Sequence, residues 1–374
     1  MDAIFQNFSN LTWQQVVMWA IGGILIFLAI NKEMEPSLLL PMGFGAILVN
    51  IPMSGAITQV IDGVKEIGVL NVLFDGGIAN ELFPLLLFIG IGAMIDFEPL
   101  LTNPKLMLFG AAAQFGIFAT LVGASLLGFP LKDAASIAII GAADGPTSIF
   151  VANYLHSNFL GPIIIAAYSY MALVPIVQPP IIKLLTTKKE RMIRMEYTGN
   201  SVNQATKILF PIIVTVIAGI FAPRSVALVG FLMFGNLIRE CGVLGGLSET
   251  AQKVLANLIT LMLGLTVAAN MQAASFLTLR TLMILALGLV AFIFDTAGGV
   301  IFGKVINLFT KKKVNPMIGA AGISAFPMAS RVVHKMGLAE DKTNHLLMHA
   351  AGANVAGQIA SVIAGGVLLS LIVK

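Results

Sequence analysis

Apolar runs recur along the whole chain of 374 residues, and several are long enough to cross a lipid bilayer as one helix. A spanning helix needs about 20 predominantly apolar residues. Only 11% of the residues are charged, whereas a soluble protein averages about 25%. The strict alternation of apolar and polar residues that marks a membrane β-barrel is absent from the sequence. The sequence therefore predicts an all-α polytopic membrane protein.

Ten apolar runs are predicted to be spans, because polar or charged residues bound each of them. They cover residues 16–30, 38–51, 82–95, 106–127, 162–182, 209–221, 226–238, 254–269, 282–301 and 346–373. Lysine and arginine gather in segment 183–207 and at Lys311–Lys313, which the positive-inside rule places in the cytoplasm. A docking surface for an acidic partner is the second interpretation of both segments. Before the first span the chain has Asp2 and no Lys or Arg, which predicts no cleavable signal peptide.

Two segments combine an apolar pattern with helix-breaking residues in their middle. Asp144-Gly145-Pro146 interrupts segment 134–157, and Pro327 interrupts segment 315–333. If segment 134–157 crossed the bilayer, the count of crossings would place the basic loop outside. We therefore predict two re-entrant hairpins, whose broken backbone must be buried in protein or line a watery cavity. The last span is predicted to carry a polar break of its own at Gly352–Gln358.

The two halves of the chain resemble each other. Ile140–Ala143 recurs as Ile318–Ala321, and the two halves start from opposite sides of the membrane. This pattern predicts inverted-topology repeats with a substrate or ion site near the midplane, and elevator-like alternating access. The predicted organisation is an N-terminal span (1–36), a first repeat (37–182), a basic loop with a linker span (183–223) and a second repeat (224–374).

Asp144 is the first candidate for ion chemistry. A carboxylate at membrane depth costs about 2.5–3.5 kcal/mol on insertion scales unless it faces a cavity, a cation or a proton path. The alternative is a hairpin turn that reaches water. Asn315, Ser324 and Asn354 lie at the breaks of the second half, and their oxygens suit an alkali cation, although a helix cap or an interhelical hydrogen bond explains each equally well. Asp295 is a second buried acid and the reserve ion ligand.

Other polar residues have weaker claims. Arg331 lies about two helical turns beyond the second break, so it either projects toward the site or anchors the hairpin at the interface. Tyr170 either relays a proton or packs between helices. His345 and His349 have the spacing of a metal pair, but we interpret them as a polar helix face because no third ligand is evident. The single cysteine, Cys241, excludes an internal disulfide.

The sequence at the breaks resembles a known family. Gly141–Ser148, Asn315–Arg331 and Gly352–Gln358 look like the β subunit of the sodium-transporting biotin-dependent decarboxylases, which serve oxaloacetate, methylmalonyl-CoA, glutaconyl-CoA and malonate systems. The resemblance runs over essentially the whole chain, whose compact length is similar to that of the shorter CoA-type members. It implies a membrane subunit that decarboxylates carboxybiotin and exports Na⁺ while a proton from outside is consumed.

The resemblance also implies site residues, cofactors and partners. The implied residues are Asp144, Tyr170 and Arg331 for catalysis, Arg331, Gly319 and Asn315 for carboxybiotin, and Asp144, Ser324, Asn315 and Asn354 for Na⁺. The implied partners are a carboxyltransferase α subunit, a biotin carrier protein or domain, a small membrane γ or δ subunit and membrane lipid, with a homo-oligomer within the complex and no nucleic acid. The implied location is the bacterial plasma (inner) membrane.

A different class of function shares many of these features. A sodium-coupled secondary transporter, which has no enzymatic step, would show the same inverted repeats and broken helices. A passive channel is disfavoured, because two opposed hairpins fit alternating access better than a continuous pore. The sequence alone leaves the transporter as the alternative to the decarboxylase subunit.

Overall fold

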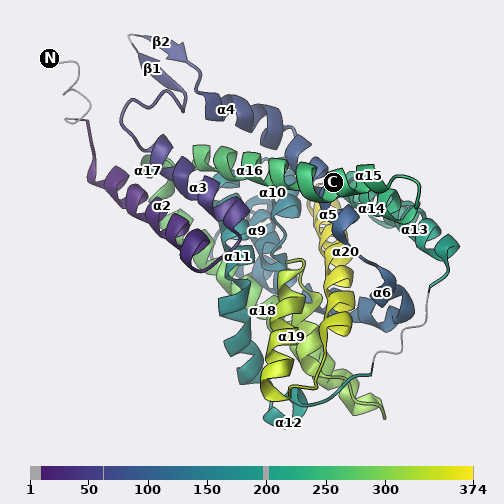
Figure 1. The fold of residues 1–374 in the computed structure, drawn as a ribbon. Coiled ribbons are helices and arrows are strands. Elements are labelled where there is room, and N and C mark those ends of the chain that lie inside the picture. Colours follow the sequence, from purple (N-terminus) through teal and green to yellow (C-terminus); the bar gives the residue numbers. More distant parts are fainter. Residues whose placement is uncertain (1–9, 62, 197–201, 374) are drawn as a thin grey trace.

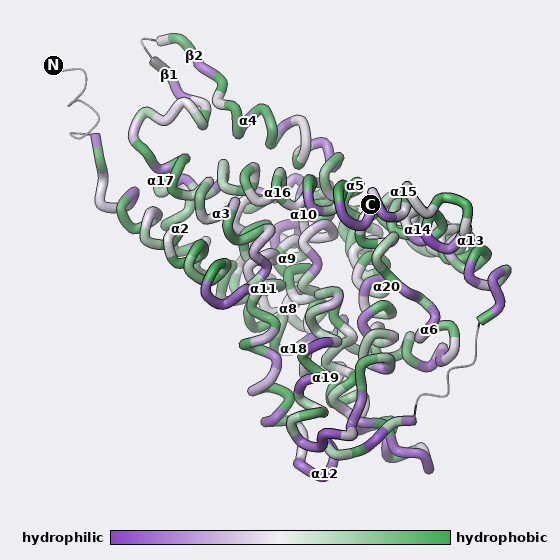
Figure 2. The backbone as a smooth tube through the Cα atoms, viewed as in Figure 1, coloured by the Kyte–Doolittle hydropathy of each residue, from purple (hydrophilic) through white to green (hydrophobic). Residues whose placement is uncertain are grey.

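The computed structural model describes residues 10–61, 63–196 and 202–373. This part of the chain is mostly helical (Figure 1), and apolar residues predominate along its helices (Figure 2). Seven of the described helices are long and apolar enough to cross a membrane. The prediction of a polytopic helical membrane protein is therefore confirmed. Asp2 and residues 197–201 of the basic segment lie outside the described residues.

All ten predicted spans form helices. In the first half these and the shorter elements are α2 (Trp13–Asn31), α3 (Pro36–Val49), α4 (Val69–Leu73), η1 (Phe74–Ala79), α5 (Leu82–Met94), α6 (Glu98–Thr102), η2 (Pro104–Leu106), α7 (Met107–Ala113), α8 (Phe115–Leu126), α9 (Leu131–Ala138), η3 (Ile139–Ala142), α10 (Gly145–Tyr154), α11 (Leu160–Leu185) and α12 (Lys188–Arg191). In the second half they are α13 (Gln204–Phe221), η4 (Pro223–Ser225), α14 (Val226–Glu240), α15 (Gly245–Glu249), η5 (Thr250–Leu255), α16 (Ala256–Val267), η6 (Ala268–Asn270), α17 (Ala273–Phe276), α18 (Leu279–Phe309), η7 (Pro316–Gly322), α19 (Met328–Glu340) and α20 (Leu347–Ile372).

Three of the predicted spans are short helices. α3, α5 and α14 have 14, 13 and 15 residues, which is less than the roughly 20 residues of a typical span. The segment 69–79 and α5 are together long and apolar enough for one span, but their axes are bent by 61°. The total of ten crossings therefore stays a prediction.

The helices pack in two groups. In the first group α5 lies along α14, with α13 and α16 beside them, and α3 lies between α2 and α16. In the second group α18 packs against α11 (Figure 1) and also against α8 and η7. Helix α20 packs against α7, η7 and α10. The second group contains both predicted hairpins, so it positions the candidate site.

Glycines set the closest crossing of the first group. A Cβ atom at Gly92 of α5 would lie 1.8 Å from the Leu232 carbonyl oxygen of α14, and one at Gly235 would lie 2.1 Å from the Ile89 oxygen. Small residues allow the backbones of membrane helices to approach in this way, which increases van der Waals contact in a lipid environment. The backbones of α5 and α14 are therefore in close contact.

A small sheet departs from the all-α prediction. β1 (Gln59–Ile61) and β2 (Val64–Glu66) form an antiparallel pair in which Gln59 lies opposite Glu66. The β-branched residues Val60 and Val64 favour extended structure, and Gly63 adopts the positive φ of +78° that this tight turn requires. The loop between the second and third spans therefore contains a short β-hairpin.

The prediction of a break in the last span is wrong. α20 is continuous from Leu347 to Ile372. Its glycines lie at close contacts instead, because a Cβ atom at Gly357 would be 2.1 Å from the Gly322 oxygen and one at Gly352 would be 2.5 Å from Leu106. The unpredicted break lies at Gln114, where α7 ends and α8 begins.

Candidate ion-binding site

The first broken segment is a helical hairpin. α9 and η3 lead to the break at Ala143 and Asp144, and α10 leads away from it. The two ends of the segment meet, because Asp133 accepts hydrogen bonds from the Ser157 hydroxyl at 2.8 Å and the Asn158 amide at 3.0 Å. Lys132 also donates to the His156 carbonyl oxygen at 3.3 Å. The chain therefore enters and leaves the hairpin at one end, with Asp144 at the other.

Asp144 caps the returning helix. Ala143 before it has a left-handed φ of +51°, which turns the chain sharply. The Asp144 carboxylate accepts from the Thr147 backbone amide at 3.2 Å and from the Thr147 hydroxyl at 2.7 Å. This is the capping geometry that aspartate favours at a helix N-terminus. The local sequence Asp-Gly-Pro-Thr therefore explains both the break and the orientation of the carboxylate.

Helix α20 completes the surroundings of this carboxylate. Ser361 donates to Asp144 Oδ2 at 2.7 Å, and the Gln358 amide donates to the same oxygen at 3.3 Å. The Asp144 side chain is only 2% exposed. None of the ion pairs formed within the described residues includes Asp144. A buried carboxylate held only by neutral donors requires a cation or a proton to offset the cost of its charge.

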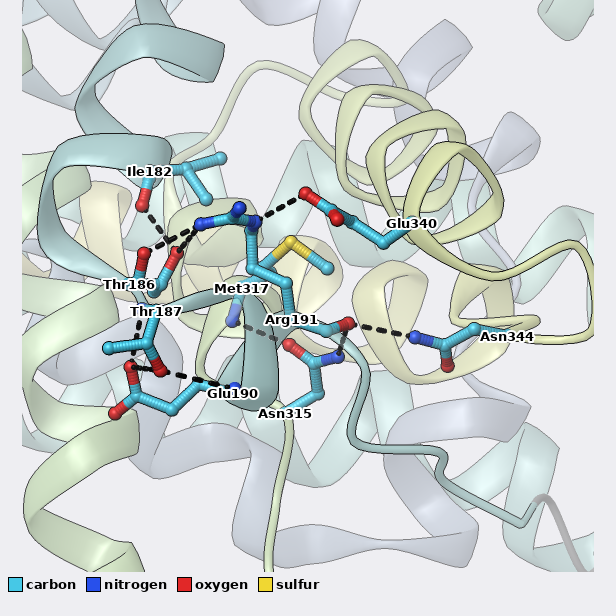
Figure 3. Close-up of polar contacts among 9 residues, drawn as sticks. All are labelled: Ile182, Thr186, Thr187, Glu190, Arg191, Asn315, Met317, Glu340 and Asn344. Atoms are coloured by element: carbon cyan, nitrogen blue, oxygen red, sulfur yellow. Dashed lines mark hydrogen bonds and ion pairs between the residues drawn. The ribbon is translucent and has the colours of Figure 1, made fainter.

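The second broken segment is also a hairpin, and both its ends meet at α12 (Figure 3). The Asn315 side chain before η7 donates to the carbonyl oxygens of Arg191 and Ile193, each at 2.9 Å, and accepts from the Met317 amide at 3.1 Å. Glu340 at the end of α19 forms an ion pair of 2.6 Å with Arg191. The Asn315 side chain thus positions the base of the hairpin and lies away from its break.

The breaks of the two hairpins contact each other. The Ser324 backbone amide donates to the Ala142 carbonyl oxygen at 2.9 Å, while the Ser324 hydroxyl donates to Gly357 of α20 at 3.0 Å. Asn354 of α20 donates to the Ile323 oxygen at 2.6 Å. Two of the predicted Na⁺ ligands, Ser324 and Asn354, therefore lie beside the second break, and α20 links them to Asp144.

Three side-chain amides donate hydrogen bonds to backbone carbonyl oxygens at the second break. Gln114, Gln178 and Asn354 donate to the carbonyl oxygens of residues 322, 320 and 323, at 3.4, 2.7 and 2.6 Å. The amide oxygen of each of these three side chains is buried without a hydrogen-bond partner among the described residues. Amide oxygens are good ligands for alkali cations, so this break is a second place where oxygens are available.

Gly319 lies at a helix contact. A Cβ atom at Gly319 would lie 1.9 Å from the Gly299 oxygen of α18, and one at Gly299 would lie 2.0 Å from the Gly319 oxygen. Neither backbone can move away without displacing η7 from α18. Close packing of the second hairpin therefore explains the glycine.

The two tyrosines of α11 face different neighbours. The Tyr170 hydroxyl donates to the Leu285 carbonyl oxygen of α18. The Tyr168 ring instead lies against Gly145, where an added Cβ atom would be 2.3 Å from the ring. The Tyr168 hydroxyl is buried without a hydrogen-bond partner in the described part of the chain. Of the two hydroxyl groups, the one beside the first break is therefore that of Tyr168.

Asp295 and Arg331 lie apart from the hydrogen bonds around Asp144. Asp295 accepts from the Ile117 amide at 3.2 Å and so caps the start of α8 after its break. Arg331 is exposed on the first turn of α19. In the loop between α2 and α3, burial raises the pKa of Glu35 and the nearby Arg331 guanidinium partly lowers it. Arg331 is thus accessible and has an acidic neighbour.

The predicted polar helix face of His345 and His349 is wrong. His345 precedes α20 and its ring centroid lies 5.8 Å from that of His334, whereas His349 is buried within α20. Helix α20 begins only at Leu347, so the two histidines do not share one helix face.

Sequence reasoning missed six polar residues around the breaks. They are Gln114, Thr147, Tyr168, Gln178, Gln358 and Ser361. A spacing signal existed for Gln358 and Ser361, because Asn354, Gln358 and Ser361 follow one another at intervals of four and three residues and so share one helix face. The other four depend on contacts or local geometry that spacing does not reveal.

The fold and the site together define a class: a multi-pass helical membrane protein with a buried acid where two broken hairpins meet. A family model described as the Na⁺-transporting oxaloacetate decarboxylase beta subunit matches residues 14–372. The chain therefore belongs to this family of β subunits of sodium-transporting decarboxylases.

Several relatives are similar over nearly their whole length. The glutaconyl-CoA decarboxylase subunit beta of Acidaminococcus fermentans is 49% identical, over 98% of this chain and 95% of the relative. The methylmalonyl-CoA decarboxylase subunit beta of Propionigenium modestum is 48% identical, over 98% and 96%. The oxaloacetate decarboxylase beta chain of Haemophilus ducreyi is 44% identical, over 99% and 98%. The predicted family is confirmed.

Proposed function

We propose that this chain couples the decarboxylation of carboxybiotin to Na⁺ export, and that Asp144 binds the Na⁺. The observation that carries the proposal is the buried Asp144 carboxylate, which receives hydrogen bonds from Thr147, Ser361 and Gln358 and has no basic partner among the described residues. Na⁺ bound there would replace the missing positive charge. The hydroxyl oxygens of Thr147 and Ser361 would complete its ligands.

A second cation would fit the amide oxygens at the second break. Ser324 and Asn354, expected as ligands, lie at this break, and Gln114 and Gln178 extend the set. The base position of Asn315 favours a structural role for that residue over direct ligation. Asp295 remains the reserve ligand, because one of its carboxylate oxygens is buried and unpaired within the described residues.

The exposed side chain of Arg331 is suited to bind the carboxylate of carboxybiotin. This carboxylate is the group that leaves as CO₂. Its guanidinium would hold a carboxylate through two parallel hydrogen bonds. Bound Na⁺ and Arg331 would both favour the entry of that negative charge, so ion and substrate would strengthen each other's binding reciprocally. Gly319, implied for carboxybiotin, supports this role by keeping the second hairpin close to α18.

The proton that replaces the carboxyl group needs a relay. Tyr170 is the relay that the family resemblance implies, and Tyr168 is the one that geometry favours, because its hydroxyl is beside the first break. General acid catalysis contributes about 100-fold or more to a rate. We propose that Tyr168→Phe lowers the rate of decarboxylation more than Tyr170→Phe does.

We propose inverted repeats that move as an elevator. Two ion pairs support the predicted sidedness: Lys207 pairs with Glu98 at 2.6 Å, and Lys304 pairs with Glu190 at 3.3 Å, and all four residues fall in segments predicted to be cytoplasmic. The division into two groups of helices supports a moving part that carries both hairpins. The four segments predicted from the sequence (1–36, 37–182, 183–223 and 224–374) are part of this proposal.

The bases of the hairpins allow a direct test of their orientation. In a Cys241→Ser background, Lys132→Cys and Lys342→Cys should be labelled from opposite sides of sealed vesicles, the former from outside and the latter from the cytoplasm. Lys342 is exposed and Lys132 is half-buried, so neither substitution opens a cavity in the core. Labelling of both from one side would contradict the inverted repeats.

The acyl substrate and the partners follow from the relatives. The two CoA-thioester subunits named above are 49% and 48% identical to this chain, and the oxaloacetate subunit is 44% identical. We propose a CoA thioester as the substrate of the complex, a carboxyltransferase α subunit, a biotin carrier and a small γ or δ subunit as partners, and the bacterial plasma membrane as the location.

Two acids of the same hairpin provide the test of Na⁺ binding. Asp144→Asn should abolish Na⁺-stimulated decarboxylation, because the amide keeps the size but removes the charge. Asp133→Asn is the matched control, since Asp133 is equally buried but lies at the base. It should lower stability and leave the Na⁺ dependence unchanged. Normal Na⁺ dependence in Asp144→Asn would contradict the proposal.

Avidin separates the two classes of function. In vesicles that contain the whole complex, avidin should block Na⁺ accumulation if biotin carries the carboxyl group. Na⁺ accumulation that is unaffected by avidin would favour the secondary transporter, which has no enzymatic step.

A further inference from the structure

A groove at the α12 end of the molecule lies outside the proposed ion site. Its volume is about 630 Å³, and it lies where the ends of α11 and α18 meet α12. Its polar lining includes Lys189, Lys304 and Lys313 with one acid, Glu190. Three positive charges and one negative charge leave a net charge of +2, which selects an anionic ligand.

The other lining of the groove is apolar and belongs to the outer face of α18. Ile301, Val305 and Leu308 line the groove, and their side chains are 48%, 42% and 78% exposed. Their spacing of four and three residues places them on one helix face. Phe294 and Val290, 43% and 41% exposed, continue this face along α18. A membrane protein covers such a face with acyl chains.

Lys304 connects the apolar face of α18 to the charged side chains at the α12 end of the groove. It lies three residues after Ile301 and four before Leu308, so its stem follows the same face. Its ammonium group reaches the α12 end, where it donates to the Leu185 carbonyl oxygen at 3.0 Å and lies 3.3 Å from Glu190. Long basic side chains extend in this way from apolar surface to the level of the lipid headgroups.

We propose that this groove binds an anionic phospholipid, with the phosphate at Lys189, Lys304 and Lys313 and an acyl chain along Ile301, Val305 and Leu308. Basic pockets between membrane helices on the cytoplasmic side suit such headgroups. The occupant must be both anionic and apolar, because the lysines and the exposed stripe adjoin in one groove. The lipid would hold α12 against the end of α18, next to the contacts of Arg191 with the second hairpin (Figure 3).

The test compares two double variants with the same change of charge. Lys189→Gln/Lys313→Gln removes two lysines of the groove, and Lys188→Gln/Lys311→Gln removes two exposed lysines outside it. Each protein is placed in nanodiscs of phosphatidylcholine, with or without a fifth of phosphatidylglycerol. Retained phosphatidylglycerol is counted by native mass spectrometry, and the melting temperature is measured in parallel. A further arm adds glycerol 3-phosphate to the phosphatidylcholine nanodiscs.

The groove variant should bind phosphatidylglycerol about 25-fold more weakly, because each lysine near an anionic headgroup contributes about fivefold, or about 1 kcal/mol. The variant outside the groove should bind it as the wild type does, and Lys189→Arg/Lys313→Arg should restore binding. Equal losses in both Gln variants would overturn the proposal. It would also fail if glycerol 3-phosphate alone stabilised the protein as much as the lipid does. Unchanged lipid binding with impaired use of the biotin carrier would instead assign the groove to a protein partner.

Discussion

Replacement of Ser361 by alanine should weaken Na⁺ activation without unfolding the protein. The Ser361 hydroxyl donates to Asp144 Oδ2 at 2.7 Å, and the change removes this donor together with a proposed Na⁺ ligand. Thr147 and Gln358 still donate to the carboxylate. The first hairpin and α20 therefore stay in contact. The loss of the donor should mainly destabilise the ionised form of Asp144, which is the form that binds Na⁺.

The size of the effect follows from the type of hydrogen bond. A hydrogen bond to a charged group contributes about 1.5–3 kcal/mol, and each 1.4 kcal/mol corresponds to a factor of ten in affinity. The half-saturating Na⁺ concentration should therefore rise by about 10- to 150-fold. The rate at saturating Na⁺ should change far less, because Arg331 and the tyrosines of α11 are unaltered.

The assay is the decarboxylation rate of the complete complex as a function of Na⁺ concentration. Ser370→Ala is the matched control, because Ser370 lies on the same helix and its hydroxyl donates to the Gly366 carbonyl oxygen at 2.9 Å, four residues earlier. Thr147→Val combined with Ser361→Ala should deviate from additivity, since both hydroxyls donate to one carboxylate oxygen. An unchanged half-saturating concentration in Ser361→Ala, or an equal shift in Ser370→Ala, would refute the reasoning.

Three other outcomes are expected. Gly319→Ala should destabilise the protein by about 1–3 kcal/mol through overpacking, seen as a lower melting temperature, whereas Gly23→Ala should be neutral because no atom lies within 4 Å of its added Cβ. The hydrogen bond from Lys207 lowers the pKa of Glu98, so this pair stabilises the fold above pH 4.5 and loses its effect as the pH falls through the lowered pKa. The difference in melting temperature between wild type and Glu98→Gln should therefore shrink from pH 7 to pH 3.5. Tyr168→Phe should slow decarboxylation by about 100-fold if this hydroxyl relays the proton, and its pH–rate profile should lose one limb.

Hydrophobic runs were sufficient to predict the helices, because in lipid every backbone group must be bonded within its own helix. The break at Asp144 was also predictable, because Gly145 and Pro146 disfavour continuation of the helix that precedes them. The false break in α20 shows the limit of this argument. Gly352 and Gly357 are placed for contact with Leu106 and Gly322, and a sequence does not distinguish a contact glycine from a breaking one.

The partners of the site could not be predicted because they are distant in sequence. Gln114 donates to Gly322, 208 residues away, and Ser361 donates to Asp144 across 217 residues. A serine in an apolar helix ordinarily bonds to its own backbone four residues earlier, as Ser370 does. The Ser361 hydroxyl also lies 3.1 Å from the Gln358 carbonyl oxygen of its own helix, and only the packing of α20 against the first hairpin adds the shorter contact with the carboxylate at 2.7 Å.

The distance in sequence between Asp144 and Ser361 has a consequence for biogenesis. The base of the first hairpin can close as soon as Asn158 has been synthesised, because Asp133 needs only residues 157 and 158. The donors of α20, Gln358 and Ser361, follow Asp144 by 214 and 217 residues and emerge from the ribosome much later. Until then the Asp144 carboxylate has Thr147, in its own turn, as its side-chain donor among the described residues, and a carboxylate at membrane depth costs about 2.5–3.5 kcal/mol on insertion scales. We therefore expect the insertion of α20 to be the late step that gives the Asp144 carboxylate its remaining donors.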